Sequence, residues 1–190
     1  FWDRAKKQVV GDNTDAPAFW EDLKLLLPQR KRSGRALVLG AGGAARAVCY
    51  QLLNQGWNLL VAARRIEQAQ ALIQDMGAGT EGKAAPLSLL DAELPASAAL
   101  QLIVNATSAG MHPKNTQSPW PDGWPLPASA AVYDLVYNPP LTAFQEQAQE
   151  SGLRTKNGLG MLVEQAALAF ECWLGCPAPR KAMRKAVQDD

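Results

Sequence analysis

A glycine-rich turn between an apolar run and a helix-forming segment is the feature that most constrains the fold. Residues 36–39 are a short, uninterrupted apolar run, as in a strand that is buried on both faces. The next six residues are Gly40-Ala41-Gly42-Gly43-Ala44-Ala45, and good helix formers continue to about Asn54. The pattern G-x-G-x-x-A in this setting predicts the first turn of a Rossmann-type unit that binds a dinucleotide.

Each position of this turn has an expected role. Gly40 allows a tight turn, Gly42 lets the backbone approach a pyrophosphate, and Ala45 permits close packing of helix against sheet. The helix start supplies free N–H donors and a positive potential. The alternative is a glycine turn with no ligand, because the motif alone has little specificity.

Strands and helices alternate along the rest of the chain. We expect strands at 57–62, 84–87, 100–104, 131–136 and 153–155, and helices at 16–27, 65–76, 142–151 and 160–173. Residues 113–127 are rich in proline and glycine and are expected to form an irregular surface excursion. The pattern predicts an α/β, Rossmann-like doubly wound parallel sheet with flanking helices, and ligands that bind at the carboxyl ends of its strands.

Composition and charge narrow the class of partner. The 190 residues are 47% hydrophobic, enough for one core, and their formal charge of +1 gives no broad basic surface for nucleic acid. No apolar run approaches the roughly 20 residues that span a bilayer, and no signal peptide is evident. We therefore expect a cytoplasmic protein with a small-molecule substrate, no nucleic acid and no membrane, and we leave a homodimer open.

The cysteines favour a reducing compartment and no metal. Their number, three, is odd, and Cys172 and Cys176 lie far in sequence from the only histidine, His112. Two thiols alone fall short of the three or four ligands that zinc takes.

The end of the second strand indicates which dinucleotide is bound. An NAD site has an acidic residue there, but this chain has Ala63-Arg64-Arg65. Two guanidinium groups beside the ribose would bind a 2′-phosphate through charge-assisted bonds, so the sequence predicts NADP(H). The alternative is that both arginines are solvated, and the sequence leaves open which of them would hold the phosphate.

Five motifs, in order along the chain, resemble those of the shikimate dehydrogenases. They are Gly11-Asp12-Asn13-Thr14-Asp15, the glycine-rich turn at 40–45, Asn105-Ala106-Thr107-Ser108-Ala109-Gly110-Met111, Asp134-Leu135-Val136-Tyr137-Asn138-Pro139 and Asn157-Gly158-Leu159-Gly160-Met161-Leu162-Val163-Glu164-Gln165. The resemblance covers residues 11–175. It implies reversible reduction of 3-dehydroshikimate to shikimate by NADPH, within aromatic amino-acid biosynthesis.

The resemblance also implies roles for individual residues. Asp15 matches the aspartate that binds the substrate and works with a catalytic lysine, and Tyr137 and Gln165 match substrate contacts. The positions that match the cofactor site are Gly40, Ala41, Gly42, Gly43, Ala44, Ala63, Arg64, Arg65, Thr107, Ser108, Leu135 and Gly158.

Each of these substrate residues has a plainer interpretation. Asp15 could cap the helix that starts at Ala16, Tyr137 could be an ordinary aromatic at a strand end, and Gln165 could be one polar position of an amphipathic helix. A stripe in that helix is expected to be core, namely Met161, Leu162, Ala166, Ala169 and Phe170.

The resemblance divides the chain into three parts. Residues 1–30 would be a hinge and remnant of the substrate lobe, residues 31–157 the NADP-binding domain, and residues 158–190 helices that pack back toward that lobe. The chain begins at Phe1 and not at Met, and the family's N-terminal lobe with its lysine has no counterpart here. We expect a truncated product that binds NADP but hardly turns over shikimate.

Three other functions remain open on the sequence. A cofactor sensor would have no use for substrate groups such as Asp15 and Gln165. A catabolic quinate or shikimate dehydrogenase that uses NAD would have an acid at position 63 or 64. An interaction protein could use Trp120 and Trp124 as a docking patch, if these side chains are exposed.

Overall fold

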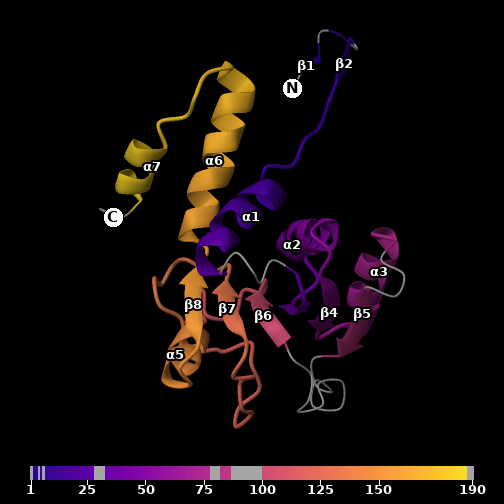
Figure 1. The fold of residues 1–190 in the computed structure, drawn as a ribbon, viewed down its shortest axis with the longest axis vertical. Coiled ribbons are helices and arrows are strands. Elements are labelled where there is room, and N and C mark those ends of the chain that lie inside the picture. Colours follow the sequence, from indigo (N-terminus) through magenta and orange to yellow (C-terminus); the bar gives the residue numbers. More distant parts are fainter. Residues whose placement is uncertain are drawn as a thin grey trace.

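The computed structural model describes residues 2–3, 5, 7–27, 33–77, 82–86 and 100–187 of the chain. Its main sheet has six parallel strands in the order β5-β4-β3-β6-β7-β8 (Figure 1). They are β3 (Arg35–Leu39), β4 (Asn58–Ala63), β5 (Gly82–Pro86), β6 (Leu100–Asn105), β7 (Ala131–Asp134) and β8 (Arg154–Asn157). The chain enters this sheet at its centre and extends it to either side, which confirms the predicted doubly wound Rossmann-like fold.

Both faces of the sheet are covered, which explains the apolar runs of its central strands. Side chains of β3 alternate between two cores, with Ala36 and Val38 in one and Leu37 and Leu39 in the other. The first core contains residues of α1 (Asp15–Leu26), α2 (Gly43–Asn54), α3 (Ile66–Asp75) and α6 (Leu159–Leu174). The second contains residues of α5 (Ala143–Glu150).

Helices α2 and α5 end, and α5 begins, close to the residues that the sequence predicts, because capping residues lie at these positions. Gly56 and Gly152 follow α2 and α5 with φ angles of +76° and +74°. Thr142 begins α5 in a capping box, in which its side chain accepts from the Gln145 backbone N–H and the Gln145 side chain accepts from the Thr142 backbone N–H.

The prediction that residues 113–127 form a surface excursion is wrong for the most apolar part of this segment. Trp120 is only 3% exposed and stacks on Phe144, with ring centroids 6.4 Å apart. Its indole Nε1 donates to the carbonyl of Trp124 at 3.2 Å. Trp120 belongs to the second core and Trp124 packs against it, so the two tryptophans do not form the docking patch of an interaction protein.

Several outer elements differ from expectation. The sequence does not predict the two-stranded antiparallel ribbon of β1 (Trp2–Asp3) and β2 (Gln8–Val9). The last helix, α7 (Arg180–Ala186), lies within residues 158–190, where helices are expected, but the sequence gives bounds only for the helix before it. In α6 the buried residues are Met161, Val163 and Ala167, while Ala166 of the expected stripe is exposed. The reason is that α6 packs on α1 and extends beyond the sheet (Figure 1).

The domain boundary at 30/31 and Leu87, the last residue of an expected strand, lie outside the described residues.

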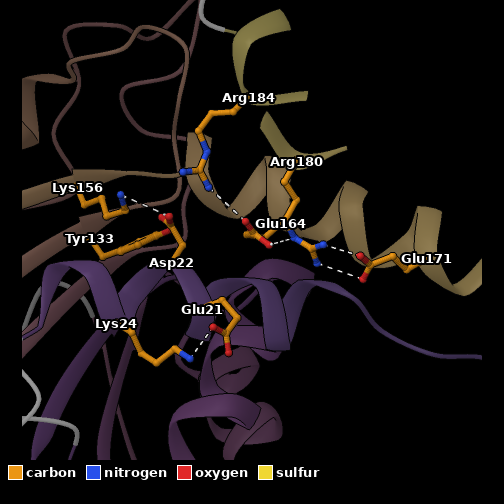
Figure 2. A network of polar contacts seen from close by, with 9 residues as sticks. All are labelled: Glu21, Asp22, Lys24, Tyr133, Lys156, Glu164, Glu171, Arg180 and Arg184. Atoms are coloured by element: carbon orange, nitrogen blue, oxygen red, sulfur yellow. Dashed lines mark hydrogen bonds and ion pairs between the residues drawn. The ribbon is translucent and has the colours of Figure 1, made fainter. Parts of the chain in front are cut away.

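A buried carboxylate fixes α1 to the sheet and to α6. Asp22 of α1 is 2% exposed, and its Oδ2 accepts from the Tyr133 hydroxyl at 2.7 Å (Figure 2). Lys156 Nζ lies 3.4 Å from Oδ1, and a Cβ built on Gly160 would overlap the carboxylate. Burial, followed by the charge and hydrogen bond of Asp22, raises the pKa of Tyr133 well above its ordinary value.

Ion pairs hold α7 against α6. Arg180 Nη1 lies 2.5 Å from Glu171 Oε1, its Nε lies 2.9 Å from Glu164 Oε2, and Arg184 Nη2 lies 3.2 Å from Glu164 Oε1 (Figure 2). The hydrogen bond from Arg180 is the main cause that lowers the pKa of Glu171 from 4.5 to about 2.

We predict that Gly160→Ala lowers the free energy of unfolding by about 1–3 kcal/mol, because the new methyl group displaces the buried Asp22 carboxylate from its partners. Gly43→Ala is the matched control, since Gly43 also lies in the first turn of a helix but has open space at its Cβ position. Urea titration measures both variants. Equal stability of the two variants would contradict this account.

We also predict that acid releases α7. The pKa of Glu171 is depressed in the folded chain, so its contribution is complete above pH 4.5 and is lost as the pH falls toward about 2. NMR shifts of the Met183 amide, which bonds to the Pro179 carbonyl, should follow this transition. In Glu171→Gln the part of the transition that comes from the Glu171 carboxylate should disappear, while the Glu164 ion pairs remain, and an identical titration in that variant would refute the assignment.

Candidate functional site

A cavity of about 320 Å³ lies at the carboxyl ends of β3, β4 and β6. We call it the nucleotide cavity, and its lining residues are Gly40, Ala41, Gly42, Ala62, Ala63, Arg64, Arg65, Gln68, Ala106, Thr107, Ser108, Ala109, Lys114, Gln117, Ser118 and Pro119. It lies where successive strands are added to opposite sides of β3, the point at which such sheets bind ligands.

The glycine turn is held tightly on the protein side and is open on the cavity side. Gly40 has a φ of +107°, and a Cβ there would lie 2.9 Å from the Ala106 carbonyl oxygen. At Gly42, the N-cap of α2, a Cβ would meet nothing within 4 Å. The first N–H groups of α2 lack partners within the helix, so this opening suits an anion such as a pyrophosphate.

Three cations surround the nucleotide cavity. Arg64, Arg65 and Lys114 are all exposed, and the described residues that line the cavity include no acidic side chain. Within the part of the chain that the structure describes, none of their side chains has a hydrogen-bond or ion-pair partner. Such a site is suited to a ligand that carries several negative charges.

Sequence reasoning missed Lys114. It lies in a turn in which its backbone N–H donates to the Met111 carbonyl at 2.7 Å and its carbonyl accepts from the Gly110 N–H at 3.2 Å. The only available signal was a basic residue shortly after the polar loop that follows β6.

The loop after β6 also contributes Thr107 and Ser108 to the lining of the nucleotide cavity. Asn105 lies buried beneath this loop, and its Oδ1 accepts from the Thr107 backbone N–H at 3.0 Å and from the Thr107 hydroxyl at 2.7 Å. Asn105 Nδ2 donates to Asp134 Oδ1 at 2.8 Å. The threonine that faces the cavity is therefore oriented from below by buried amide and carboxyl groups.

Other expected cofactor residues lie outside this lining. Gly43 and Ala44 begin α2, directly after Gly42. Leu135 and Gly158 follow β7 and β8 and touch each other, since a Cβ on Gly158 would overlap the Leu135 carbonyl. The structure thus divides the expected cofactor residues into a group that lines the nucleotide cavity, two residues at the start of α2 next to it, and a pair near the ends of β7 and β8.

The three expected substrate residues lie on separate elements. Asp15 is the first residue of α1, Tyr137 follows β7 and is 44% exposed, and Gln165 lies half-buried on α6. Among the described residues no hydrogen bond joins any two of them, and none lines the nucleotide cavity.

The capping interpretation of Asp15 is wrong. The N-cap position of α1 is Thr14, and it is the Asn13 side chain whose Oδ1 accepts from the Ala16 backbone N–H at 3.0 Å. The Asp15 carboxylate is therefore not needed to start α1.

A second cavity, of about 840 Å³, lies beside the N-terminal motif. It is lined by Gly11, Asp12, Asn13, Ala16, Pro17, Gly43, Arg46, Ala47, Tyr50, Gln51, Asp75 and Met76. Arg46 and Asp75 form an ion pair of 2.9 Å within this lining. The second cavity is therefore lined both by residues of the Gly11–Asp15 motif and by Gly43, the residue that follows Gly42.

The described residues offer neither a metal site nor a membrane span. They contain no group of three or more His, Cys, Asp or Glu placed to hold a metal ion. No helix in the described ranges is long and apolar enough to cross a membrane.

Comparison with known proteins identifies the family. Residues 25–116 match the family described as Shikimate / quinate 5-dehydrogenase, and residues 158–188 match the Shikimate 5′-dehydrogenase C-terminal domain. The shikimate dehydrogenase (NADP(+)) of Carboxydothermus hydrogenoformans is 41% identical over 180 residues, which are 95% of this chain and 63% of that protein. That of Methanopyrus kandleri is 36% identical over 185 residues, covering 96% of this chain and 64% of the relative.

Solved structures agree with these matches. Shikimate 5-dehydrogenase from Thermus thermophilus in complex with NADP(H) and shikimate aligns with a TM-score of 0.78 and 39% identity, over 94% of this chain and 63% of that one. Quinate dehydrogenase from Corynebacterium glutamicum in complex with NAD aligns with a TM-score of 0.83 and 28% identity, over 98% and 65% of the two chains. The chain thus spans slightly less than two thirds of the length of these relatives, and by motif order, sequence and fold it belongs to the shikimate dehydrogenase family.

Proposed function

We propose that the nucleotide cavity binds NADP(H). The observation that carries this proposal is a set of three cations, Arg64, Arg65 and Lys114, which have no partner and no acidic neighbour in the cavity lining among the residues that the structure describes. The adenosine 2′-phosphate would lie beside these cations and the pyrophosphate at Gly42 and the start of α2. The NADP(+) named for the curated relatives supports this choice over the NAD of the quinate enzyme.

The reaction that we propose is reduction of 3-dehydroshikimate to shikimate in aromatic amino-acid biosynthesis. NADPH, when bound, supplies the hydride for a ring carbonyl. Asp15 would bind ring hydroxyls, and Tyr137 and Gln165 would contact the rest of the substrate, in line with the shikimate bound to the Thermus relative. These side chains would fix the ring relative to the cofactor, and orientation of this kind is a large part of catalysis.

We further propose that the nucleotide domain occupies residues 31–157 and that α1 and α6 form the substrate-side support. The buried contact of Asp22 with Gly160 supports the pairing of these two helices, because it joins the helix that begins at Asp15 to the helix that carries Gln165.

Replacement of Arg64 or Arg65 should affect the binding of NADP+ and of NAD+ differently. We expect Arg64→Ala or Arg65→Ala to raise the Kd for NADP+ at least about tenfold, since one charge-assisted hydrogen bond is worth about 1.5–3 kcal/mol. The Kd for NAD+ should change little, because NAD+ lacks the 2′-phosphate. Isothermal titration calorimetry measures both.

Arg46→Ala is the control, because Arg46 is also exposed but is paired with Asp75 outside the nucleotide cavity. A change in one arginine variant alone would assign the phosphate to that arginine. Unchanged NADP+ affinity in both variants would contradict the proposed site.

Glycine replacements test the pyrophosphate position. A methyl group at Gly42 meets no protein atom, so Gly42→Ala should leave the Tm within about 2 °C and yet raise the Kd for NADP+ at least about tenfold. Gly40→Ala should instead lower the Tm, because φ is positive and the Ala106 carbonyl lies in the way. Tight NADP+ binding by Gly42→Ala would place the pyrophosphate elsewhere.

A further inference from the structure

Two loops at the ligand-facing edge of the sheet meet at one buried carboxyl group. Asp134, the last residue of β7, is fully buried and lines neither cavity. Its Oδ1 accepts from Asn105 Nδ2 at 2.8 Å and from the Val136 backbone N–H at 3.0 Å. Its Oδ2 accepts from the Thr142 hydroxyl at 2.6 Å. Three donors at these distances satisfy a group that would otherwise be costly to bury.

The first loop is oriented through the Asn105 side chain. Because Asn105 directs its NH2 group to Asp134 and to the Ala109 carbonyl, its oxygen faces Thr107 and accepts both Thr107 donors. Thr107 Oγ1 in turn accepts from the Ala109 N–H at 3.1 Å. A flipped amide would place its NH2 group against the Thr107 N–H, so Asp134 fixes the amide orientation that shapes this loop.

The second loop is held at both ends by the same group. Val136 precedes Tyr137, and Thr142 closes the segment and begins α5. Burial raises the pKa of Asp134, whereas the hydrogen bonds from Thr142, Val136 and Asn105 oppose that rise. All three partners donate, so each of them favours the ionised carboxylate.

We propose that Asp134 is a positioning residue that couples the Thr107 loop of the nucleotide cavity to the Tyr137 loop, and that it sets both before ligand binds. The effect of Asp134 on the affinity for NADP+ rests on the proposed function, since Thr107 must face the bound NADP+. The effect of Asp134 on the order of the two loops does not depend on that function. The order of the loops and the binding of nucleotide are therefore measured separately.

The first experiment compares Asp134→Ala with Tyr133→Phe in the whole chain. Without nucleotide, amide hydrogen exchange at Thr107 and Ala109 should accelerate at least about tenfold in Asp134→Ala, because the Asn105 amide loses its orientation. The Kd for NADP+ should rise at least about fivefold. Tyr133→Phe alters the neighbouring buried residue, removes its bond to Asp22 and should leave both quantities within about twofold.

A second pair of variants keeps the proposal testable if Asp134→Ala does not fold. Thr142→Val removes the donor to Asp134, whereas Thr142→Ser retains it. We expect faster exchange at Thr107, 35 positions away, in the valine variant and wild-type exchange in the serine variant.

Equal exchange at Thr107 in the valine and serine variants, or in folded Asp134→Ala and wild type, would overturn the coupling. If the wild-type chain does not bind NADP+ but exchange responds as expected, the proposed function fails and the positioning role of Asp134 stands.

Discussion

The pairing of β3 with β4 on one side and β6 on the other determines where the functional residues lie. Leu39, the last residue of β3, is in register with Ala62 and with Asn105. Because the three strands are parallel, the residues that follow them meet at one edge. This register brings the glycine turn, the arginines after β4 and the Thr107 loop to a single cavity, although they are distant in sequence.

The features that the sequence predicts are those with local causes. The apolar run before Gly40 and the helix formers after it identify the strand, turn and helix without knowledge of the rest of the chain. The sequence predicts that Arg64 and Arg65 face the cofactor, because parallel pairing carries the end of the next strand to the same edge of the sheet. Because doubly wound sheets share this topology, a local sequence pattern at the end of a strand is enough to predict a residue of the binding site.

The features that the sequence does not reveal depend on contacts between distant segments. Lys114 reaches the cavity from a proline-rich segment whose course depends on Trp120, which packs on Phe144 of α5. No periodicity encodes that contact. Asp134 likewise resembles any polar residue at a strand end until the structure shows its three donors.

The absence of a side chain at Gly160 affects how freely α1 and α6 can move against each other. Because a glycine faces the Asp22 carboxylate, α1 and α6 approach closely, and the Tyr133 hydroxyl and the Lys156 ammonium hold that carboxylate from the sheet. Tilting or sliding one helix against the other would strip a buried charge of its partners, which is far costlier than deforming an apolar contact. The two helices should therefore move together as one rigid unit, and any change in the spacing between them and a neighbouring part of the molecule would have to come from a bend at another point of the chain.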